Sequence, residues 1–238
     1  MSEMKMLEVD KGLVTFDIRM RATTAGPSPD NNQRVELFLL GCKKAQKGNP
    51  CKGCFNSITW DIGKAEFSRD PIEIADFIAK NAPNKYITIG GGEPTDQIHA
   101  LIPLTKRLKE HGFHIMMYTW RDLEKALNNS CQYVQPNYVE GIYSYSIAYD
   151  IIDLLENIDI VVDGEFVLEE KLYIEDFNDG MFGSIGSGNQ RIWDIKHTND
   201  THTDKYKQKK YNSMYMRELK GIKLNPETND LIYIKKGD

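Results

Sequence analysis

Short apolar runs that alternate with amphipathic stretches constrain the fold of this chain more than any other feature. Residues 35–40 and 86–89 are apolar runs of strand length, and glycine follows each of them directly. Between the two runs, Asp70 is the expected N-cap of a helix whose first residue is Pro71. Buried strands that alternate with helices are typical of a parallel sheet with crossover connections.

The alternation continues on both sides of these two runs. We expect further strands at residues 13–18, 114–118 and 158–162, and helices at residues 96–111, 120–127 and 148–157. The periodicity fits an α/β protein built either on an open doubly wound sheet or on a partial barrel. In both architectures, ligands bind at the C-terminal ends of the strands.

The C-terminal part of the chain differs in character from the rest. Residues 197–211 are polar and rich in lysine, which is typical of a loop. Residues 221–234 are predicted to form a hairpin that turns at Asn225. We therefore expect one main domain over residues 1–196 and a small extension of unknown role over residues 197–238.

Composition and charge narrow the classes of function. The chain of 238 residues is long enough for one large domain, and its formal net charge of −5 argues against a nucleic-acid-binding surface. It has no apolar run near the ~18 to 20 residues that a membrane span requires, and its first residues do not resemble a secretory signal. We therefore expect a cytoplasmic protein with no membrane or nucleic-acid partner, whose cysteines are metal ligands or free thiols rather than disulfides.

Three of the cysteines, Cys42, Cys51 and Cys54, lie close together directly after the first apolar run. Three thiolates can hold an iron-sulfur cube and leave one iron open to another molecule. They can also form a structural zinc site if a histidine supplies the fourth ligand. The histidines available for that role are His99, His111, His114, His197 and His202. The cysteines alone leave both readings open.

A glycine run follows the second apolar run, in the segment Gly90-Gly91-Gly92-Glu93-Pro94. Backbone without side chains can approach a polar ligand closely and present its amide and carbonyl groups. A tight turn from strand to helix would use the same residues. The segment follows one strand and one helix after the cysteines, so both features are expected at the same edge of the sheet.

Taken together, these motifs resemble the radical S-adenosylmethionine superfamily. Within it, Cys51-Lys-Gly-Cys54-Phe55-Asn56 and the glycine run are similar to the activating enzymes of anaerobic ribonucleoside-triphosphate reductase. A second block agrees with that family: residues 162–166, Val-Asp-Gly-Glu-Phe, followed by residues 186–191, Gly-Ser-Gly-Asn-Gln-Arg. The resemblance spans roughly residues 12–195 and implies a partial barrel of mostly parallel strands.

The resemblance implies two cofactors and the residues that hold them. Cys42, Cys51 and Cys54 would bind a 4Fe-4S cluster, whose fourth iron is chelated by the amino and carboxylate groups of S-adenosylmethionine. The segment Gly91, Gly92, Glu93 and Pro94 would meet the methionine amino group, largely through its backbone. The ring of Phe55 would lie near the adenine.

Three further residues have a less specific reading. Thr119 matches a position that lines the cofactor site in the family, but it also suits the N-cap of the expected helix at residues 120–127. Asn189 would contact the cofactor or a partner, or else fasten a loop through its amide group. Cys131 follows no ligand spacing, so we expect an inert thiol.

The implied activity is radical generation on another protein. In the family, a reduced cluster cleaves S-adenosylmethionine to methionine and a 5'-deoxyadenosyl radical, which removes a hydrogen atom from a glycine of the reductase large subunit. The implied partners are that subunit and an electron donor such as flavodoxin. The alternatives are activation of another glycyl-radical enzyme, a radical enzyme acting on a small molecule in the manner of a deazaguanine synthase, and a zinc-stabilised binding protein without catalysis.

One feature departs from the family. Relatives usually place three residues between the first two cysteines, whereas eight separate Cys42 from Cys51. Because the ligands need only converge in space, a longer loop closes the same cube at a small additional entropic cost.

Overall fold

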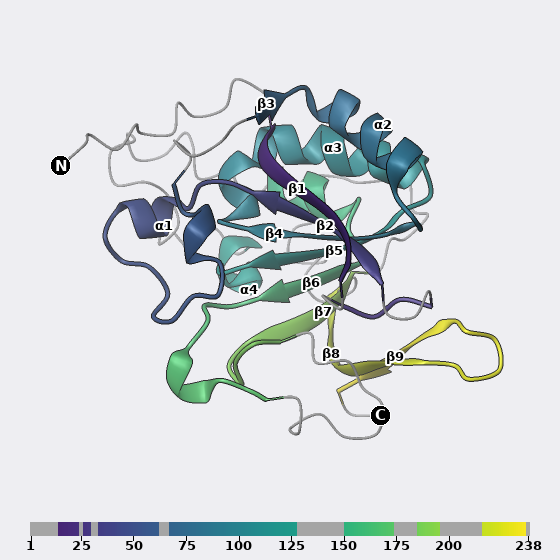
Figure 1. The fold of residues 1–238 in the computed structure, drawn as a ribbon. Coiled ribbons are helices and arrows are strands. Elements are labelled where there is room, and N and C mark those ends of the chain that lie inside the picture. The colour runs from purple at the N-terminus through teal and green to yellow at the C-terminus, as the bar shows by residue number, and fades with distance from the viewer. Residues whose placement is uncertain are drawn as a thin grey trace.

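A computed structural model describes residues 14–23, 26–29, 33–61, 67–127, 150–173, 185–195 and 216–236. Its nine strands form a single sheet in the order β3-β1-β2-β4-β5-β6-β7-β8-β9 (Figure 1). The strands are β1 (Val14–Thr23), β2 (Arg34–Leu39), β3 (Phe67–Arg69), β4 (Tyr86–Gly91), β5 (His114–Thr119), β6 (Ile160–Asp163), β7 (Arg191–Ile195), β8 (Met216–Leu224) and β9 (Leu231–Lys235).

The centre of the sheet is parallel, as expected for this α/β class. Strands β2, β4, β5 and β6 pair in parallel, and helices connect them. These connections contain α2 (Pro71–Asn81), α3 (Ile98–Glu110), α4 (Leu123–Leu127) and a helical stretch at residues 150–155. The α/β partial barrel is thus confirmed, with a parallel core of four strands.

Antiparallel strands extend this core on both sides. Strands β1 and β3 continue it beyond β2, and β7, β8 and β9 continue it beyond β6. The predominance of parallel pairing therefore holds only for the central strands. An antiparallel pair such as β8 and β9 needs only a short turn, whereas a parallel pair needs a crossover.

The local predictions hold with shifted boundaries. Asp70 caps α2 by accepting hydrogen bonds from the backbone N–H groups of Ile72 and Glu73. The helix expected from residue 96 begins as a 3-10 turn, η3 (Pro94–Gln97), and continues as α3. The C-terminal hairpin turns at Asn225 as predicted, although β8 already begins at Met216.

One predicted helix begins later than expected, and two predicted features lie outside the described residues. The helix expected from residue 120 begins only at Leu123, because the side chain and carbonyl of Asp122 accept the N–H groups of Lys125 and Ala126 in the first turn of α4. Strand β7 was not predicted. The expected loop at residues 197–211 and Cys131 lie outside the described residues.

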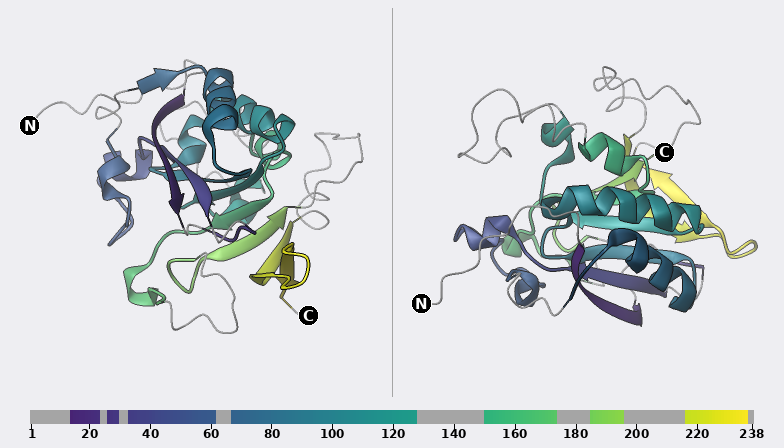
Figure 2. Two further views of the ribbon diagram at one scale, coloured as in Figure 1. Left: turned by 45° about the vertical axis from the view of Figure 1, so that its right-hand side comes forward. Right: turned by 90° about the horizontal axis from the view of Figure 1, so that it is seen from above.

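Two hydrophobic clusters fill the two faces of the sheet. One packs α2 and α3 against the residues of β2, β4 and β5 that point to their side, such as Leu37, Ile89 and Met117. The other covers the opposite face of the strands, with Met116 and Val162, and continues into β8 with Ile222. Figure 2 shows the same arrangement, in which the helices lie on one side and the C-terminal hairpin continues the curve of the sheet.

A buried arginine lies where β2 begins. Arg34 donates hydrogen bonds to the Thr88 hydroxyl at 2.9 Å and to the carbonyls of Pro27 and Ile87 at 2.7 Å each. His114 accepts a further bond from the guanidinium through Nδ1 at 3.3 Å, so its other nitrogen, Nε2, carries the proton toward the Tyr233 hydroxyl at 2.8 Å. Tyr233 belongs to β9, so the C-terminal hairpin closes this end of the barrel.

Candidate functional site

The C-terminal ends of β2 and β4 are joined backbone to backbone. The N–H of Gly92 donates to the carbonyl of Leu39, and the N–H of Glu93 donates to that of Gly41, each at 2.8 Å. A Cβ on Gly92 would overlap the Gly41 carbonyl, and Gly91 has a φ of +105°, which side chains rarely adopt. The glycines therefore bring the segment after β4 against the start of the cysteine loop.

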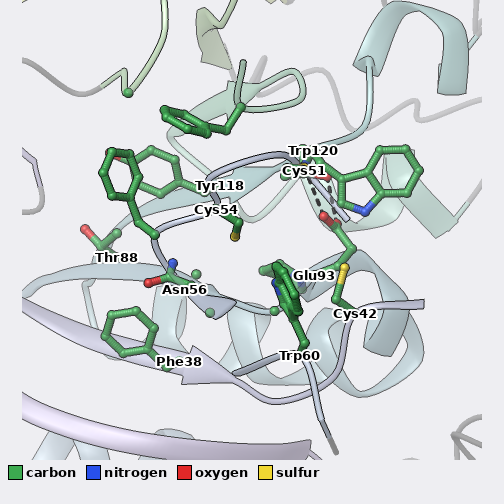
Figure 3. Close-up of a pocket in the computed structure, with 18 of the residues that line it drawn as sticks. Phe38, Cys42, Cys51, Cys54, Asn56, Trp60, Thr88, Glu93, Tyr118 and Trp120 are labelled. Atoms are coloured by element: carbon green, nitrogen blue, oxygen red, sulfur yellow. Dashed lines mark hydrogen bonds between the residues drawn. The ribbon is translucent and has the colours of Figure 1, made fainter. Parts of the chain in front are cut away.

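A pocket of about 360 Å³ opens beside this junction. Its walls include the three clustered cysteines, the glycine run, Phe55, and inward-facing residues of β2, β4 and β5. Figure 3 shows Cys42, Glu93 and Trp120 toward one side of the pocket, with Phe38, Thr88 and Tyr118 toward the other. The sequence motifs that lie far apart in the chain thus meet in one cavity.

The cysteine loop is folded rather than extended. Cys42 is buried at the N-cap of α1 (Lys43–Gln46), a single helical turn formed by the extra residues between the first two cysteines. Cys51 and Cys54 are half-buried and lie on one turn, closed by the hydrogen bond from the Cys54 N–H to the Cys51 carbonyl at 3.2 Å. The longer spacing therefore adds a helical turn to the rim of the pocket.

Burial changes the acidity of two of these thiols. It raises the pKa of Cys42 to about 12 and the pKa of Cys51 to about 11. At neutral pH both thiols therefore keep their protons unless a cation stabilises the thiolates. Binding of iron would supply that positive charge and release the protons.

Three thiols on the wall of one pocket are the donor set that a 4Fe-4S cluster takes, with each thiolate bound to a different iron. Within the described ranges, no three side chains of histidine, cysteine, aspartate or glutamate gather as one metal ion would require. His111 and His114 contact Asp76 and Tyr233, and neither lines the pocket, whereas His197 and His202 lie outside the described residues.

Glu93, directly after the glycines, is fully enclosed by hydrogen-bond donors. Its carboxylate accepts bonds from the N–H and hydroxyl of Thr95, from the hydroxyl of Thr119 at 2.7 Å, and from the N–H of Trp120 at 3.0 Å. Burial raises the pKa of Glu93, and the positive charge of Arg121 opposes that shift. The side chain thus ties the ends of β4 and β5 together.

Thr119 and Pro94 take structural positions at the same junction. Thr119 lines the pocket, but its hydroxyl donates to Glu93 and accepts from the Arg121 N–H at 3.1 Å. It is not the N-cap of α4, because Asp122 holds that place. Pro94 is buried as the first residue of η3 and also lines the pocket.

Residues just beyond the glycine motif hold the start of the cysteine loop. The Asp96 carboxylate accepts the N–H of Lys43 at 2.7 Å, and the Gln97 amide donates to the carbonyl of Leu40 at 2.8 Å. Arg121 contacts the other oxygen of Asp96 at 2.6 Å. These contacts were not predicted from the sequence, although Asp96 follows Glu93 and Pro94 closely in the chain.

Phe55 stands at the rim of the pocket. Its ring is 4.7 Å from that of Phe166, centroid to centroid, and its side chain is 63% exposed. A Cβ on Gly186 would press against both rings, so this glycine makes room for them. The ring is exposed enough to stack on a flat ligand such as a purine base, and the Lys171 ammonium lies over it, 5.5 Å from its centre.

The second motif block forms one structural unit. The buried Asp163 accepts two hydrogen bonds from Arg191, at 2.6 and 3.0 Å, and thereby joins β6 to β7. The Gln190 amide donates to the Gly164 carbonyl, and the Asn189 amide donates to the Glu165 carbonyl at 2.8 Å. Asn189 is not among the residues that line the pocket, and its contact with the cofactor or a partner stays a prediction.

The comparisons with known proteins agree with this geometry. The sequence model of the 4Fe-4S single cluster domain family matches residues 31–193. The chain belongs to this family. The expected kinship with the radical S-adenosylmethionine superfamily is thereby confirmed.

Two similar proteins share about a quarter of their residues with the matched part of this chain. The chain is 25% identical to an anaerobic ribonucleoside-triphosphate reductase-activating protein of Vibrio cholerae, over 142 residues that cover 58% of this chain and 76% of the relative. A protein of the same name from Haemophilus influenzae is 23% identical over the same shares. Among the helices that the structure describes, none is long and apolar enough to cross a bilayer.

Proposed function

We propose that this chain is a radical S-adenosylmethionine enzyme that generates a glycyl radical on anaerobic ribonucleoside-triphosphate reductase. The observation that carries the proposal is the meeting of Cys42, Cys51 and Cys54 with the glycine run in one pocket. The two activating proteins that the chain resembles support the choice of partner.

In this proposal the three cysteines hold the cluster and leave one iron for the cosubstrate. When bound and reduced, the cluster supplies the single electron that splits the sulfonium of S-adenosylmethionine into methionine and a 5'-deoxyadenosyl radical. Transfer of a hydrogen atom from the partner glycine to that radical gives 5'-deoxyadenosine and the glycyl radical. A flavodoxin-like donor in a reducing cytoplasm would return one electron for each turnover.

The charge of the pocket supports a cationic cosubstrate. Among the described residues that line it, Glu36 and Glu93 carry carboxylates, and there is no lysine, arginine or histidine. S-adenosylmethionine carries a sulfonium and an ammonium group, which such a lining attracts.

The glycine segment has a defined part in this proposal. The N–H groups of Gly92 and Glu93 are already bonded within the chain. The methionine ammonium is a donor, so it would meet carbonyl oxygens of this segment rather than its amides. The exposed face of Phe55 would stack on the adenine, and the walls around it would exclude water.

Anaerobic reconstitution with iron and sulfide tests the cofactor assignment. With S-adenosylmethionine and dithionite, the loaded protein should form 5'-deoxyadenosine, and Cys51→Ala should lose this activity. Cys131→Ala makes the same chemical change at the cysteine that follows no ligand spacing, and it should retain the activity. Turnover that survives loss of Cys51 would contradict the proposal.

The choice of partner needs a second experiment. Mixed with the reductase large subunit, the loaded protein should produce the doublet of a glycyl radical in electron paramagnetic resonance. A deazaguanine-synthase-like enzyme, whose relatives also have lengthened cysteine loops, would give no doublet with any glycyl-radical enzyme. Its substrate would instead accelerate the formation of 5'-deoxyadenosine.

A further inference from the structure

A buried ion pair lies directly behind the cysteine loop. The Nη2 atom of Arg121 is 2.6 Å from Oδ1 of Asp96, and the two side chains are 14% and 1% exposed. The other oxygen of Asp96, Oδ2, accepts the backbone N–H of Lys43 at 2.7 Å. One carboxylate therefore connects the end of β5, through Arg121, to the residue that follows Cys42.

The position of this contact is informative because Lys43 is the first residue of α1. Cys42 occupies the N-cap, but its side chain makes no capping hydrogen bond. Asp96 comes from η3 and supplies an acceptor to the first turn in its place. The loop is thus anchored by a residue from another element, and the thiol of Cys42 remains available to the pocket.

Arg121 is itself fixed in place by several contacts. Its Nε donates to the Thr95 hydroxyl at 2.7 Å, and its guanidinium lies 4.7 Å from the centre of the Trp120 ring. The Thr95 hydroxyl in turn donates to Glu93. These contacts hold the guanidinium on the side of Asp96 away from Lys43, so Asp96 is the charge that touches the cysteine loop.

The field of the pair at Cys42 is negative. Asp96 reaches the backbone N–H of Lys43 through Oδ2, whereas Arg121 contacts Oδ1, so the negative member of the pair is the one bonded to the residue after Cys42. An electron added to a cluster held by Cys42 would meet the same field. Because these groups are enclosed by protein, solvent screens them far less than it screens charges on the surface.

We propose that Asp96, held by Arg121, is a positioning residue for the cluster: it anchors the loop at Cys42 and keeps the reduction potential of the cluster low. This inference rests on the cluster of the proposed function but not on the identity of the substrate. The charge and the hydrogen bonds around a cluster are general determinants of its potential. A low potential is what reduction of a sulfonium requires.

The test is a reductive titration of the reconstituted protein without S-adenosylmethionine, followed by electron paramagnetic resonance of the reduced cluster. Asp96→Asn keeps an acceptor for the Lys43 N–H but removes the negative charge, so its midpoint potential should be more positive than that of the parent. Arg121→Met removes the positive charge and leaves Asp96, so its midpoint should be more negative. Shifts of opposite sign are a signature that loosened packing does not produce.

Asp76→Asn is the matched control. Asp76 of α2 forms an ion pair with Arg107 of α3 at 2.7 Å on the helical side of the sheet, and the two side chains are 46% and 36% exposed. Its midpoint should equal that of the parent. Asp96→Ala, which also loses the acceptor for Lys43, should retain less iron per chain than Asp96→Asn after the same reconstitution.

Several outcomes would overturn the inference. One is that the midpoint potentials of Asp96→Asn and Arg121→Met shift with the same sign. Another is that neither shift exceeds that of Asp76→Asn. Circular dichroism shows whether each variant folds. If one of the two does not, the sign of the shift in midpoint potential of the other still tests the inference. Normal formation of 5'-deoxyadenosine with unshifted potentials would overturn this inference alone, whereas opposite shifts without 5'-deoxyadenosine would overturn only the proposed function.

Discussion

The two ends of the parallel strands each bury a charge, but they hold it in opposite ways. At the C-terminal end, Glu93 accepts hydrogen bonds from Thr95, Thr119 and Trp120. At the N-terminal end, Arg34 donates to Thr88, to two backbone carbonyls and to His114. In both places neutral dipoles solvate most of the charge, because burial of a bare ion would cost several kcal/mol.

The surroundings of the two charges differ more than the charges do. Glycines around Glu93 keep side chains away and leave a pocket beside the backbone. Around Arg34 the side chains of Tyr86, His114 and Tyr233 fill the space, and the hairpin of β8 and β9 covers it. The C-terminal end is shaped to admit a ligand, and the N-terminal end is filled and closes the barrel. Mutations at the two ends should therefore differ in their effects on stability and on cluster binding.

The largest loss of stability is expected where the glycines after β4 pack against the end of β2. In Gly92→Ala the new methyl group would overlap the Gly41 carbonyl, and backbone must move to relieve it. We expect a loss of more than about 4 kcal/mol in the free energy of unfolding, enough to remove most of the margin of an ordinary domain. Urea denaturation measures it.

Gly90→Ala is the control for this prediction. Gly90 lies inside β4, two residues before Gly92, and a Cβ there would meet nothing within 4 Å. Its free energy of unfolding should stay within about 1 kcal/mol of the parent. If both variants lose the same stability, the close backbone approach at Gly92 is not what the glycine run provides.

A mutation at the closed end of the barrel, around Arg34, should lower the stability of the protein without loss of the cluster. Arg34→Met leaves the Thr88 hydroxyl and the carbonyls of Pro27 and Ile87 without their donor. The loss of this donor from three acceptors in a buried site should cost about 3 kcal/mol in total. Iron content after reconstitution should remain that of the parent, and a protein that lost iron in proportion to stability would contradict the separation of the two ends.

The same end predicts a dependence of stability on pH. Burial, with help from the positive charge of Arg34, lowers the pKa of His114 to about 4 from its usual value of 6.5. Below pH 6.5 the unfolded chain binds a proton that the folded chain refuses, so stability falls as the pH falls from 6.5 toward 4. Between pH 7.5 and 5 the loss should be about 2 kcal/mol.

Comparison of denaturation at these two pH values in the parent and in His114→Gln checks this assignment. The variant has no titrating ring, so its stability should decline less over the same interval. An equal decline in both proteins would mean that groups other than His114 cause the loss of stability at acidic pH.

The smallest effect is expected on the surface of the cysteine loop. Lys52 and Glu169 form an ion pair whose side chains are 74% and 62% exposed. Exposed pairs are screened by water and salt, so Glu169→Gln should cost less than about 0.5 kcal/mol. Unfolding in urea measures the change in stability, and the iron content should equal that of the parent. A marked loss of stability or of iron would show that the loop depends on its surface contacts.

Local patterns were sufficient for the elements and the motifs. Alternating apolar runs predicted the parallel strands, and the positions of the cysteines and the glycine run directly after two of them predicted that both lie at one edge of the sheet. Each of these signals lies within a few neighbouring residues. Backbone geometry acts over the same range, so such features can be read without knowledge of the fold.

The contacts that hold the site could not be predicted in this way. Asp163 and Arg191 are 28 residues apart, and Arg34 and Thr88 are 54 residues apart. Nothing in the local sequence marks them as partners, because only the pairing of strands brings them together. Strand β7 was missed for a related reason: it follows a motif-bearing loop and finds its partner only in the assembled sheet.

The continuation of the sheet past β7 has a practical consequence. The family match ends at residue 193, whereas β8 pairs with β7 through residues 216–219. A chain shortened to the matched segment would expose a row of unpaired backbone groups along β7, which invites pairing with another molecule. Attempts to trim this protein for crystallisation or expression should therefore retain β8 and β9, or they will yield oligomers and precipitate.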